Sequence, residues 1–437
     1  MSISGQIYLA RELKDLILNH LDKGSIAACT LLTRDPQWHA VAREHLFRKI
    51  VIHDKYKNHN HNLFAFHQLL DSGCTEHTLK YIKGLTICGE SSVDTELTAV
   101  DLGRILMSLP GLDSLHLEKV WIQTSAGGSS LSFPPPSLKE LHLEHVYLTL
   151  EIDLKRASGT DDEPIVPSQF SLVELLRLFK SIDVFHLRHI EFTWHSALEQ
   201  HANRVALLRS VAHREGQKVA TPLGVIDFAL VAPKAPNFLF LLEMITNSST
   251  LGAVQRLEVS PPDKAVSDVE SILPRVALTL DHVHIHLHHT EYLALITFNL
   301  SSCRKLRSLR LSSDFHVSGA IPVHRGDKVG ALFRTAQQAP QSITELEIEL
   351  RYHRHYPQGR PAILQNLMLD WEALDKNLSS RAELMEVQFV INELRSSICG
   401  EPLPEVFAQE IELVKRGLPL LLAKKRVDIK YVEAGST

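Results

Sequence analysis

Residues 112–122 read LDSLHLEKVWI, and residues 138–148 read LKELHLEHVYL. Six of these eleven aligned positions are identical, and the two segments lie 26 residues apart in the chain (138 minus 112). Residues 185–190, which read FHLRHI, repeat the centre of the pattern. Similarity of this length within one chain indicates internal duplication, so each copy is expected to form the same local structure.

Each copy follows the order apolar-x-x-apolar-x-apolar, which is typical of the short strand in a leucine-rich repeat. Weaker copies start at Ile82, Leu223, Val254, Leu280, Leu306, Ile343 and Leu384. The steps from Val254 to Leu280 and from Leu280 to Leu306 are again 26 residues. Other steps are longer, and apolar residues between the strands have helical spacing, for example at residues 172–179. The predicted fold is an α/β solenoid of irregular leucine-rich repeats with parallel strands on its concave side.

The N-terminal residues follow a different, purely helical pattern. Leu13, Leu16 and Ile17 are spaced as one face of an amphipathic helix. Ser25 suits the N-cap of a second short helix, and Pro36 suits the first position of a third. Three short helices form a very small core, so this small all-α module is expected to depend on a neighbour or a partner for stability.

These N-terminal residues resemble a known family. The segment LARELKDLI at residues 9–17, with Trp38 and the segment HLFR at residues 45–48, resembles an F-box. More narrowly, it is similar to the F-box-like proteins abundant in mushroom-forming (basidiomycete) fungi, which end much as this chain does. The sequence departs from the family at Ala10, where proline is usual, and by two extra residues between Arg34 and Trp38. The resemblance thus covers both ends of the chain, and the repeat supports the middle.

The resemblance implies a function in protein recognition. The helices would bind a Skp-family adaptor, and through it a cullin, by way of Leu9, Leu13, Ile17, Leu21 and Trp38. The domains would be an F-box-like helical module at residues 1–52, a connecting segment at residues 53–75 and an irregular leucine-rich repeat domain with a C-terminal cap at residues 76–437. The protein would then be the substrate-recognition subunit of a Skp–cullin–F-box ubiquitin ligase, binding a protein substrate and performing no chemistry itself.

The exposed positions of the repeated strands are the candidate substrate-binding residues. Alternation along a strand places the middle polar residue of each copy on the face opposite the apolar core. These residues are His116, His142, His186, His284, Arg310 and Glu347. On successive strands His284 is expected to lie beside Arg310, and Arg310 beside Glu347. A scaffold that binds proteins outside any ubiquitin ligase would use the same surface and stays open as an alternative.

The histidines at residues 282–286 suggest a metal site. His282, His284 and His286 alternate along one predicted strand and would share one face, where neutral imidazoles can bind Zn²⁺ or Cu²⁺. Residues two apart on a strand are about 7 Å apart, which is long for three ligands of one ion unless a loop assists. We therefore predict polar filling of an exposed face and expect no metal or cofactor, with a metal-dependent enzyme as the alternative.

Composition and motifs argue against other classes. The chain has 437 residues, 44% of them apolar and 22% charged, and a net charge of -5, so neither nucleic acid nor a membrane is an expected partner. The five cysteines form no CxxC pair, which favours a reducing compartment. No phosphate-binding loop, dinucleotide fingerprint, nucleophile elbow or HExxH segment occurs, so we expect no catalytic residues. Without a signal-peptide core or a long apolar segment, the protein is expected to be intracellular, in the cytoplasm, the nucleus or both.

Overall fold

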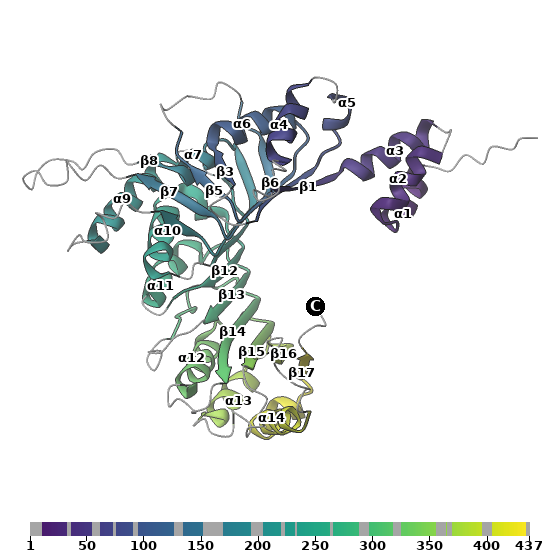
Figure 1. The fold of residues 1–437 in the computed structure, drawn as a ribbon. Coiled ribbons are helices and arrows are strands. Elements are labelled where there is room, and N and C mark those ends of the chain that lie inside the picture. Colours follow the sequence, from purple (N-terminus) through teal and green to yellow (C-terminus); the bar gives the residue numbers. More distant parts are fainter. Residues whose placement is uncertain are drawn as a thin grey trace, which may run out of the picture. The chain divides into compact units, whose positions relative to one another are not determined.

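The computed structural model describes residues 11–32, 36–54, 62–72, 76–90, 95–125, 134–151, 169–193, 204–219, 223–231, 234–262, 265–287, 297–317, 325–354, 364, 369–395 and 404–433 (Figure 1). The chain forms two compact units. Unit 1 comprises Met1–Phe185 and Ile190–Ala202, and unit 2 comprises His186–His189 and Asn203–Thr437. The domain boundaries expected after residues 52 and 75 stay predictions.

Unit 1 begins with three short helices, α1 (Arg11–Asn19), α2 (Lys23–Leu32) and α3 (Pro36–Phe47). Their shared core is small and consists of Leu18, Ile26, Val41 and Ala42. Helix α2 begins two residues before the expected N-cap, because the Asp22 carboxylate accepts hydrogen bonds from the Ser25 backbone N–H at 3.0 Å and from its hydroxyl at 2.6 Å. Asp22 therefore caps the free amides at the start of α2.

The largest element is a parallel sheet of twelve strands whose order follows the chain. Its strands are β1 (Lys49–Asp54), β2 (Gly84–Gly89), β4 (Ser114–Glu118), β6 (Ser137–Glu144), β9 (Ser181–Arg188), β11 (Asp227–Val231), β12 (Arg256–Ser260), β13 (His282–Leu287), β14 (Ser308–Val317), β15 (Glu345–Arg354), β16 (Glu386–Arg395) and β17 (Val427–Glu433). Because the order follows the chain, these strands have no point at which the strand order reverses. Such a reversal is where open α/β sheets usually bind ligands.

A second, smaller sheet lies in unit 1. It pairs β3 (Glu96–Thr98), β5 (Trp121–Gln123), β7 (Tyr147–Glu151) and β10 (Glu191–Thr193) in parallel, and β8 (Gln169–Phe170) joins β7 in the antiparallel sense. Lys119 lies between β4 and β5, and His145 lies between β6 and β7; both have φ of 52°. These two residues are 26 positions apart (145 minus 119), so the duplication includes a left-handed turn of the backbone.

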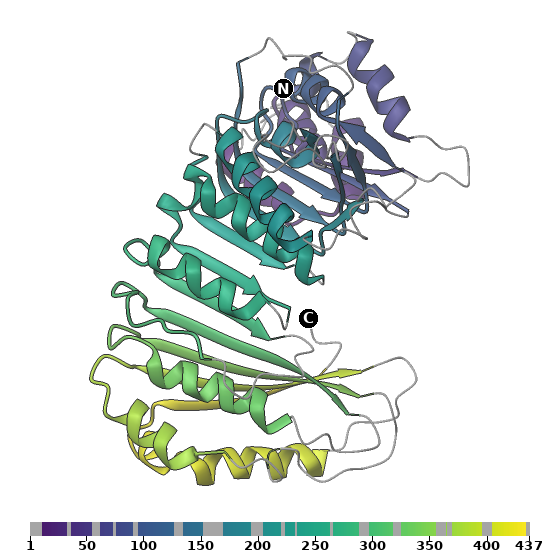
Figure 2. The same cartoon turned by 90° about the vertical axis from the view of Figure 1, so that its left-hand side faces the viewer.

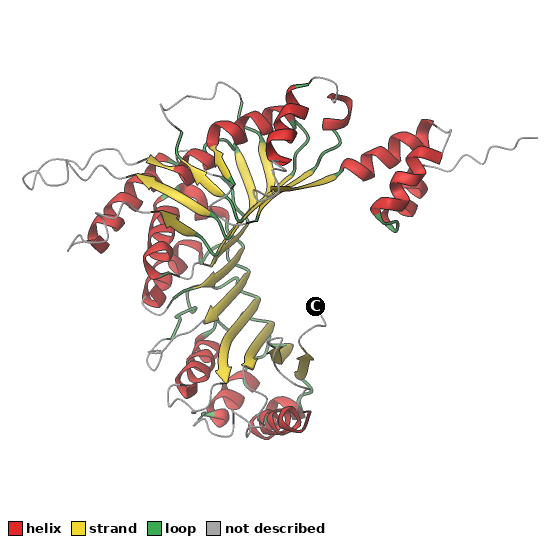
Figure 3. Cartoon of the chain, in the orientation of Figure 1, coloured by secondary structure: helices red, strands yellow, loops and turns green. Residues whose placement is uncertain are grey.

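Helices connect the strands, so helix and strand alternate along most of the chain (Figure 3). They are α4 (Asn62–Asp71), α5 (Glu76–Leu79), α6 (Ala99–Ser108), α7 (Ser171–Leu176), α9 (Arg204–Lys218), α10 (Ala235–Asn247), the 3-10 helix η2 (Ser249–Ala253), α11 (Val266–Val276), α12 (Arg325–Gln338), α13 (Trp371–Ser379), α14 (Pro404–Gly417) and α15 (Pro419–Ala423). In unit 2, α12 and α13 lie along one face of β14 to β16 (Figure 2). Apolar strand residues such as Leu311 and Ile348 are fully buried under this helical layer.

The fold predicted from the sequence, a small all-α module followed by an irregular leucine-rich repeat solenoid, is wrong. The chain is an α/β protein in which one twelve-stranded parallel sheet begins at Lys49, inside the region expected to be all-α. Equivalent positions are 26 residues apart between β13 and β14 (308 minus 282) but 41 apart between β15 and β16 (386 minus 345). The apolar pattern located strands because every buried parallel strand is rich in such residues. It did not specify how the strands assemble.

Candidate functional site

Helix α1 carries an uncovered apolar stripe. Leu13, Leu16 and Ile17 are 48%, 56% and 41% exposed, although their spacing is that of a helix face that usually packs inside a protein. The residue of α1 that enters the small core is Leu18. These three exposed residues, the α1 stripe, therefore leave one side of the helix open in the part of the chain that the structure describes.

Contacts between α1 and α3 fix the direction in which the stripe points. The His45 Nε2 atom of α3 lies 3.0 Å from Asp15 Oδ1 of α1. Lys14, which is buried, places its Nζ atom 5.7 Å from the centre of the Trp38 ring, within the range of a cation–π contact. Asp15 and Lys14 thus hold α1 against α3 and turn the stripe outward.

The predicted adaptor-binding residues fall into two environments. Leu13 and Ile17 belong to the α1 stripe, whereas Leu21 and Trp38 pack partly against the module's own core. Leu9 lies outside the described residues. Leu16 was not among the predicted binding residues, although its helical spacing from Leu13 was the signal that could have added it.

In unit 1, two predicted binding histidines lie side by side on the sheet. The register pairs His116 of β4 with His142 of β6, and their ring centroids are 5.8 Å apart in an edge-on arrangement. His116 Nε2 also lies 3.5 Å from Glu144 Oε2. On the neighbouring strand the Cys88 thiol lies 3.4 Å from a Glu118 oxygen, and burial followed by this hydrogen bond raises the pKa of Cys88 to about 11. Cys88 is therefore a protonated hydrogen-bond donor at neutral pH.

In unit 2, the register brings together the other predicted residues. His284 lies opposite Arg310, and Arg310 lies opposite Glu347, as the strand pattern predicted. Elsewhere on the sheet, His186 Nε2 lies 3.2 Å from Asp227 Oδ1. The structure thus places His284, Arg310 and Glu347 in one row, called the polar row below. Whether these residues bind a substrate stays a prediction.

The polar row is tied to a buried carboxylate on the same face. Glu349 accepts hydrogen bonds from Arg310 Nη2 at 2.8 Å, Arg351 Nη2 at 2.9 Å and Asn392 Nδ2 at 3.1 Å. Burial by itself would raise the pKa of Glu349, but the hydrogen bonds from Arg351 and Arg310 outweigh it and lower the pKa to about 2. Arg310 Nε also lies 3.1 Å from Glu347 Oε1, so one guanidinium serves two carboxylates.

His284 is neutral at physiological pH for a related reason. Burial, followed by the positive charge of Arg310, lowers the pKa of His284 to about 3. Its Nε2 atom lies 2.9 Å from the Ser312 hydroxyl, and its Nδ1 atom lies 4.0 Å from Glu258. The imidazole is therefore engaged by groups of the protein itself.

Ser312, His286 and Asp314 form a chain of hydroxyl, imidazole and carboxylate. Ser312 Oγ lies 2.6 Å from His286 Nδ1, and His286 Nε2 lies 3.2 Å from Asp314 Oδ2. This order of groups resembles an activated nucleophile, but Ser312 is 0% exposed, so a substrate cannot reach its oxygen in this conformation. Among the described residues, no set of three or more His, Cys, Asp or Glu side chains is arranged to hold a metal ion.

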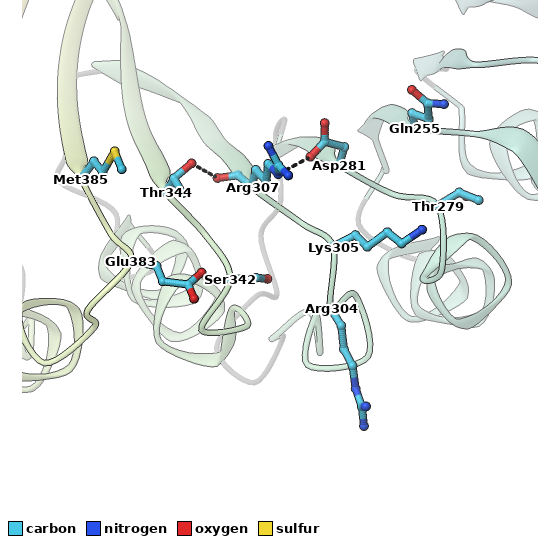
Figure 4. A pocket seen from close by; sticks show the side chains of 10 residues that line it. All are labelled: Gln255, Thr279, Asp281, Arg304, Lys305, Arg307, Ser342, Thr344, Glu383 and Met385. Carbon is cyan, nitrogen blue, oxygen red and sulfur yellow. Dashed lines mark hydrogen bonds and ion pairs between the residues drawn. The ribbon is translucent and has the colours of Figure 1, made fainter.

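A cavity of about 850 Å³ lies at the amino-terminal ends of β12 to β16 in unit 2 (Figure 4). This edge pocket is lined by Gln255, Thr279, Asp281, Arg304, Lys305, Arg307, Ser342, Thr344, Glu383 and Met385. Its volume is within the range of ligand sites, about 300–1,000 Å³. The pocket was not predicted from the sequence, although three basic residues within positions 304–307, directly before a strand, were a signal for it.

Comparison with known protein sequences gives no relative of this chain. No protein-family model matches the chain, and no curated protein matches its sequence. Within the described part of the chain, none of the helices combines the length and apolar character that crossing a bilayer requires. The function is therefore argued from the geometry of the α1 stripe and of unit 2.

Proposed function

We propose that this protein is the substrate-recognition subunit of a Skp–cullin–F-box ubiquitin ligase. Helices α1 to α3 would bind a Skp-family adaptor, and through it a cullin, while the sheet-bearing units would bind a protein substrate. The observation that carries this proposal is the α1 stripe, because three neighbouring apolar side chains are left uncovered on one helix. The protein would contribute proximity, by holding the substrate near the ubiquitin-loading enzyme.

Burial of the stripe offers a physical reason for adaptor binding. Complete burial of one leucine or isoleucine side chain is worth about 1.5–3 kcal/mol, and roughly half of that remains available at each of the three positions. Among the side chains that the structure describes, the core of the three helices holds four buried apolar residues, so a partner that covers α1 would also enlarge this core. Binding and stabilisation of the module would therefore accompany each other.

A reducing location agrees with this role. Cys29, Cys88 and Cys303 are free thiols, as is usual for proteins of the cytoplasm or the nucleus. We infer that the protein acts in one or both of these compartments. A membrane or a nucleic acid has no part in the proposed function.

A protein-binding scaffold that works outside any ligase is the second candidate. The observation in its favour is that Leu21 and Trp38 pack against the module's own core. In such a scaffold helices α1 to α3 would serve only as a structural cap and would bind no adaptor. The two candidates differ in a single measurable property, which is binding of the adaptor.

The test is a pull-down of the tagged full-length protein, probed for adaptor and cullin. We expect capture by the wild type and loss in the Leu13→Asp/Ile17→Asp double variant, which places two charges on the α1 stripe. The matched control is Leu278→Asp/Leu420→Asp, because these leucines, one in the turn after α11 and one on α15, are 79% and 49% exposed. Equal capture by both double variants, or no capture by a folded wild type, would rule out the ligase proposal.

A further inference from the structure

The edge pocket is built from two rows of residues that repeat from strand to strand. The inner row directly precedes β13 to β16 and consists of Asp281, Arg307, Thr344 and Met385. The outer row lies two residues earlier in each segment and consists of Thr279, Lys305, Ser342 and Glu383. Neighbouring strands are about 4.8 Å apart. Lys305 and Glu383 precede β14 and β16, two strands that are two steps apart in the sheet and therefore about 10 Å from each other.

The backbone of the inner row is already hydrogen-bonded. The backbone N–H groups of Arg307, Thr344 and Met385 each donate to the carbonyl oxygen of the preceding inner-row residue at 2.8 Å. This ladder fixes the spacing of the side chains and leaves recognition to the side chains alone. The pocket is thus preorganised, which lowers the entropic cost of binding.

Two opposite charges in the outer row are available to a ligand. Lys305 and Glu383 have neither a hydrogen bond nor an ion pair with their side chains in the part of the chain that the structure describes. In Figure 4 the Lys305 side chain extends toward Thr279, and the Glu383 carboxylate lies near Ser342. Arg307 Nε and Asp281 Oδ1, in contrast, are only 3.7 Å apart and balance each other.

The two ends of the pocket differ in charge, because Arg304 and Lys305 lie at one end and Glu383 at the other. Ser342 donates its proton to the Leu306 carbonyl oxygen at 2.9 Å, and Thr344 donates to the Arg307 carbonyl oxygen at 3.3 Å. Their oxygen atoms are therefore acceptors toward the pocket, on the same side as Glu383. This end suits a cationic group, whereas the end at Lys305 suits an anionic group.

The polar row is a less favourable binding site for a ligand than the edge pocket. Arg310 is bound by Glu347 and Glu349, and the neutral His284 ring is engaged by Ser312. A ligand at the polar row would have to break these contacts and leave buried charges without partners. The edge pocket imposes no such cost, because Lys305 and Glu383 are exposed to solvent.

We propose that the edge pocket binds an extended segment of a partner protein that carries an acidic and a basic side chain three residues apart. The acidic side chain would meet Lys305 and the basic side chain would meet Glu383. In a polyproline II segment, residues three apart lie on the same side and about 9.3 Å from each other, which matches the spacing across the two strands. Met385, 74% exposed beside Glu383, would cover the apolar part of the basic side chain.

Four fluorescein-labelled octapeptides test this inference with the full-length protein by fluorescence anisotropy. The first is GGEPPKGG, and the other three carry glutamine in place of the glutamate, the lysine or both. We expect the first to bind best and each lost charge to weaken binding about three- to fivefold, as for solvent-exposed ion pairs. Lys305→Glu should abolish the preference for the glutamate, and Glu383→Lys should abolish the preference for the lysine.

The matched control is Lys376→Glu on α13, because Lys376 is exposed and lies outside the pocket. Its peptide ranking should equal that of the wild type. Equal binding of the four peptides, no binding of any, or the same ranking in Lys305→Glu as in the control would overturn the inference. The inference rests on the proposed function, in which this segment belongs to the substrate. If the protein discriminates between the peptides but does not bind the adaptor, the ligase proposal is wrong and the pocket proposal stands. If it binds the adaptor but does not discriminate between the peptides, the pocket proposal is wrong and the ligase proposal stands.

Discussion

Strand β4 in unit 1 and strands β14 and β15 in unit 2 begin with the same apolar pattern and continue differently. β4 has five residues, after which the chain turns at Lys119, buries Val120 and continues into β5 of the second sheet with Ile122 buried. β14 and β15 have ten residues each and bury polar groups such as Ser312 and Glu349. The shared pattern therefore specifies a strand, and the residues after it decide what that strand covers.

The turn that follows β4 depends on a single residue, whereas the buried polar groups of β14 and β15 depend on residues from other strands. A left-handed turn is encoded at one position and repeats with the duplication, as Lys119 and His145 show. A buried carboxylate needs partners from other strands: Glu349 binds Arg310, 39 residues away, and Asn392, 43 residues away. Unit 2 should therefore be more sensitive than unit 1 to the loss of one polar side chain.

The largest effect is expected from Glu349→Ala. The substitution leaves Arg310 and Arg351 without their shared carboxylate, which should lower the free energy of unfolding by about 2–4 kcal/mol, since both arginines keep part of their contact with water. Urea unfolding of the full chain measures this change. Glu118→Ala in unit 1 is the comparison and should cost about 1 kcal/mol, because it removes one thiol hydrogen bond and a solvent-exposed ion pair with Lys119. Equal losses of unfolding free energy in the two variants would contradict the expectation that unit 2 is more sensitive than unit 1 to the loss of one polar side chain.

A second effect concerns acid stability. The pKa of His284 is lowered to about 3 from an ordinary 6.5, so the unfolded chain binds more protons than the folded chain between these values. Stability should therefore fall as the pH falls through this window, by roughly 2 kcal/mol over two pH units. Urea midpoints at pH 6.5 and pH 4.5 measure the loss. His284→Asn should reduce this loss of stability between pH 6.5 and pH 4.5. If the loss is the same in His284→Asn as in the wild type, titratable groups other than His284 cause it.

The smallest effect is expected at the turn of unit 1. Lys119 has φ of 52°, where a β-branched residue is strained. Lys119→Val should therefore cost about 1–2 kcal/mol, whereas Lys119→Gly should leave stability nearly unchanged. Urea unfolding of both variants separates backbone strain from the loss of the lysine side chain. Similar losses in both would show that the side chain, rather than the backbone, matters at this position.

The sequence predicted those features that depend on local pattern. The apolar spacing located most strands of the large sheet but neither β1 nor the strands of the second sheet. The common register then placed His284, Arg310 and Glu347 together. The architecture could not be derived in the same way, because buried parallel strands share one apolar pattern in many assemblies. Leu13 and Ile17 of the α1 stripe were predicted as binding residues only through the resemblance, since helical spacing is the same for a face in a core and for one that meets a partner.

The edge pocket could not be predicted from the sequence for a different reason. Its outer row joins residues such as Lys305 and Glu383 that are 78 positions apart in the chain (383 minus 305) and meet only through the register of three strands. The charges themselves were visible in the sequence, but nothing in their spacing connected them. Sites of this kind depend on strand order, which a single sequence specifies weakly.

The proposed function depends most on binding of α1 to a Skp-family adaptor. Its most direct test is calorimetric titration of the purified adaptor into the full-length protein. We expect saturable binding to the wild type and to Leu278→Asp/Leu420→Asp, with affinity at least about tenfold weaker for Leu13→Asp/Ile17→Asp. Absence of binding to the folded wild type, or equal affinity of the two double variants, would contradict the account.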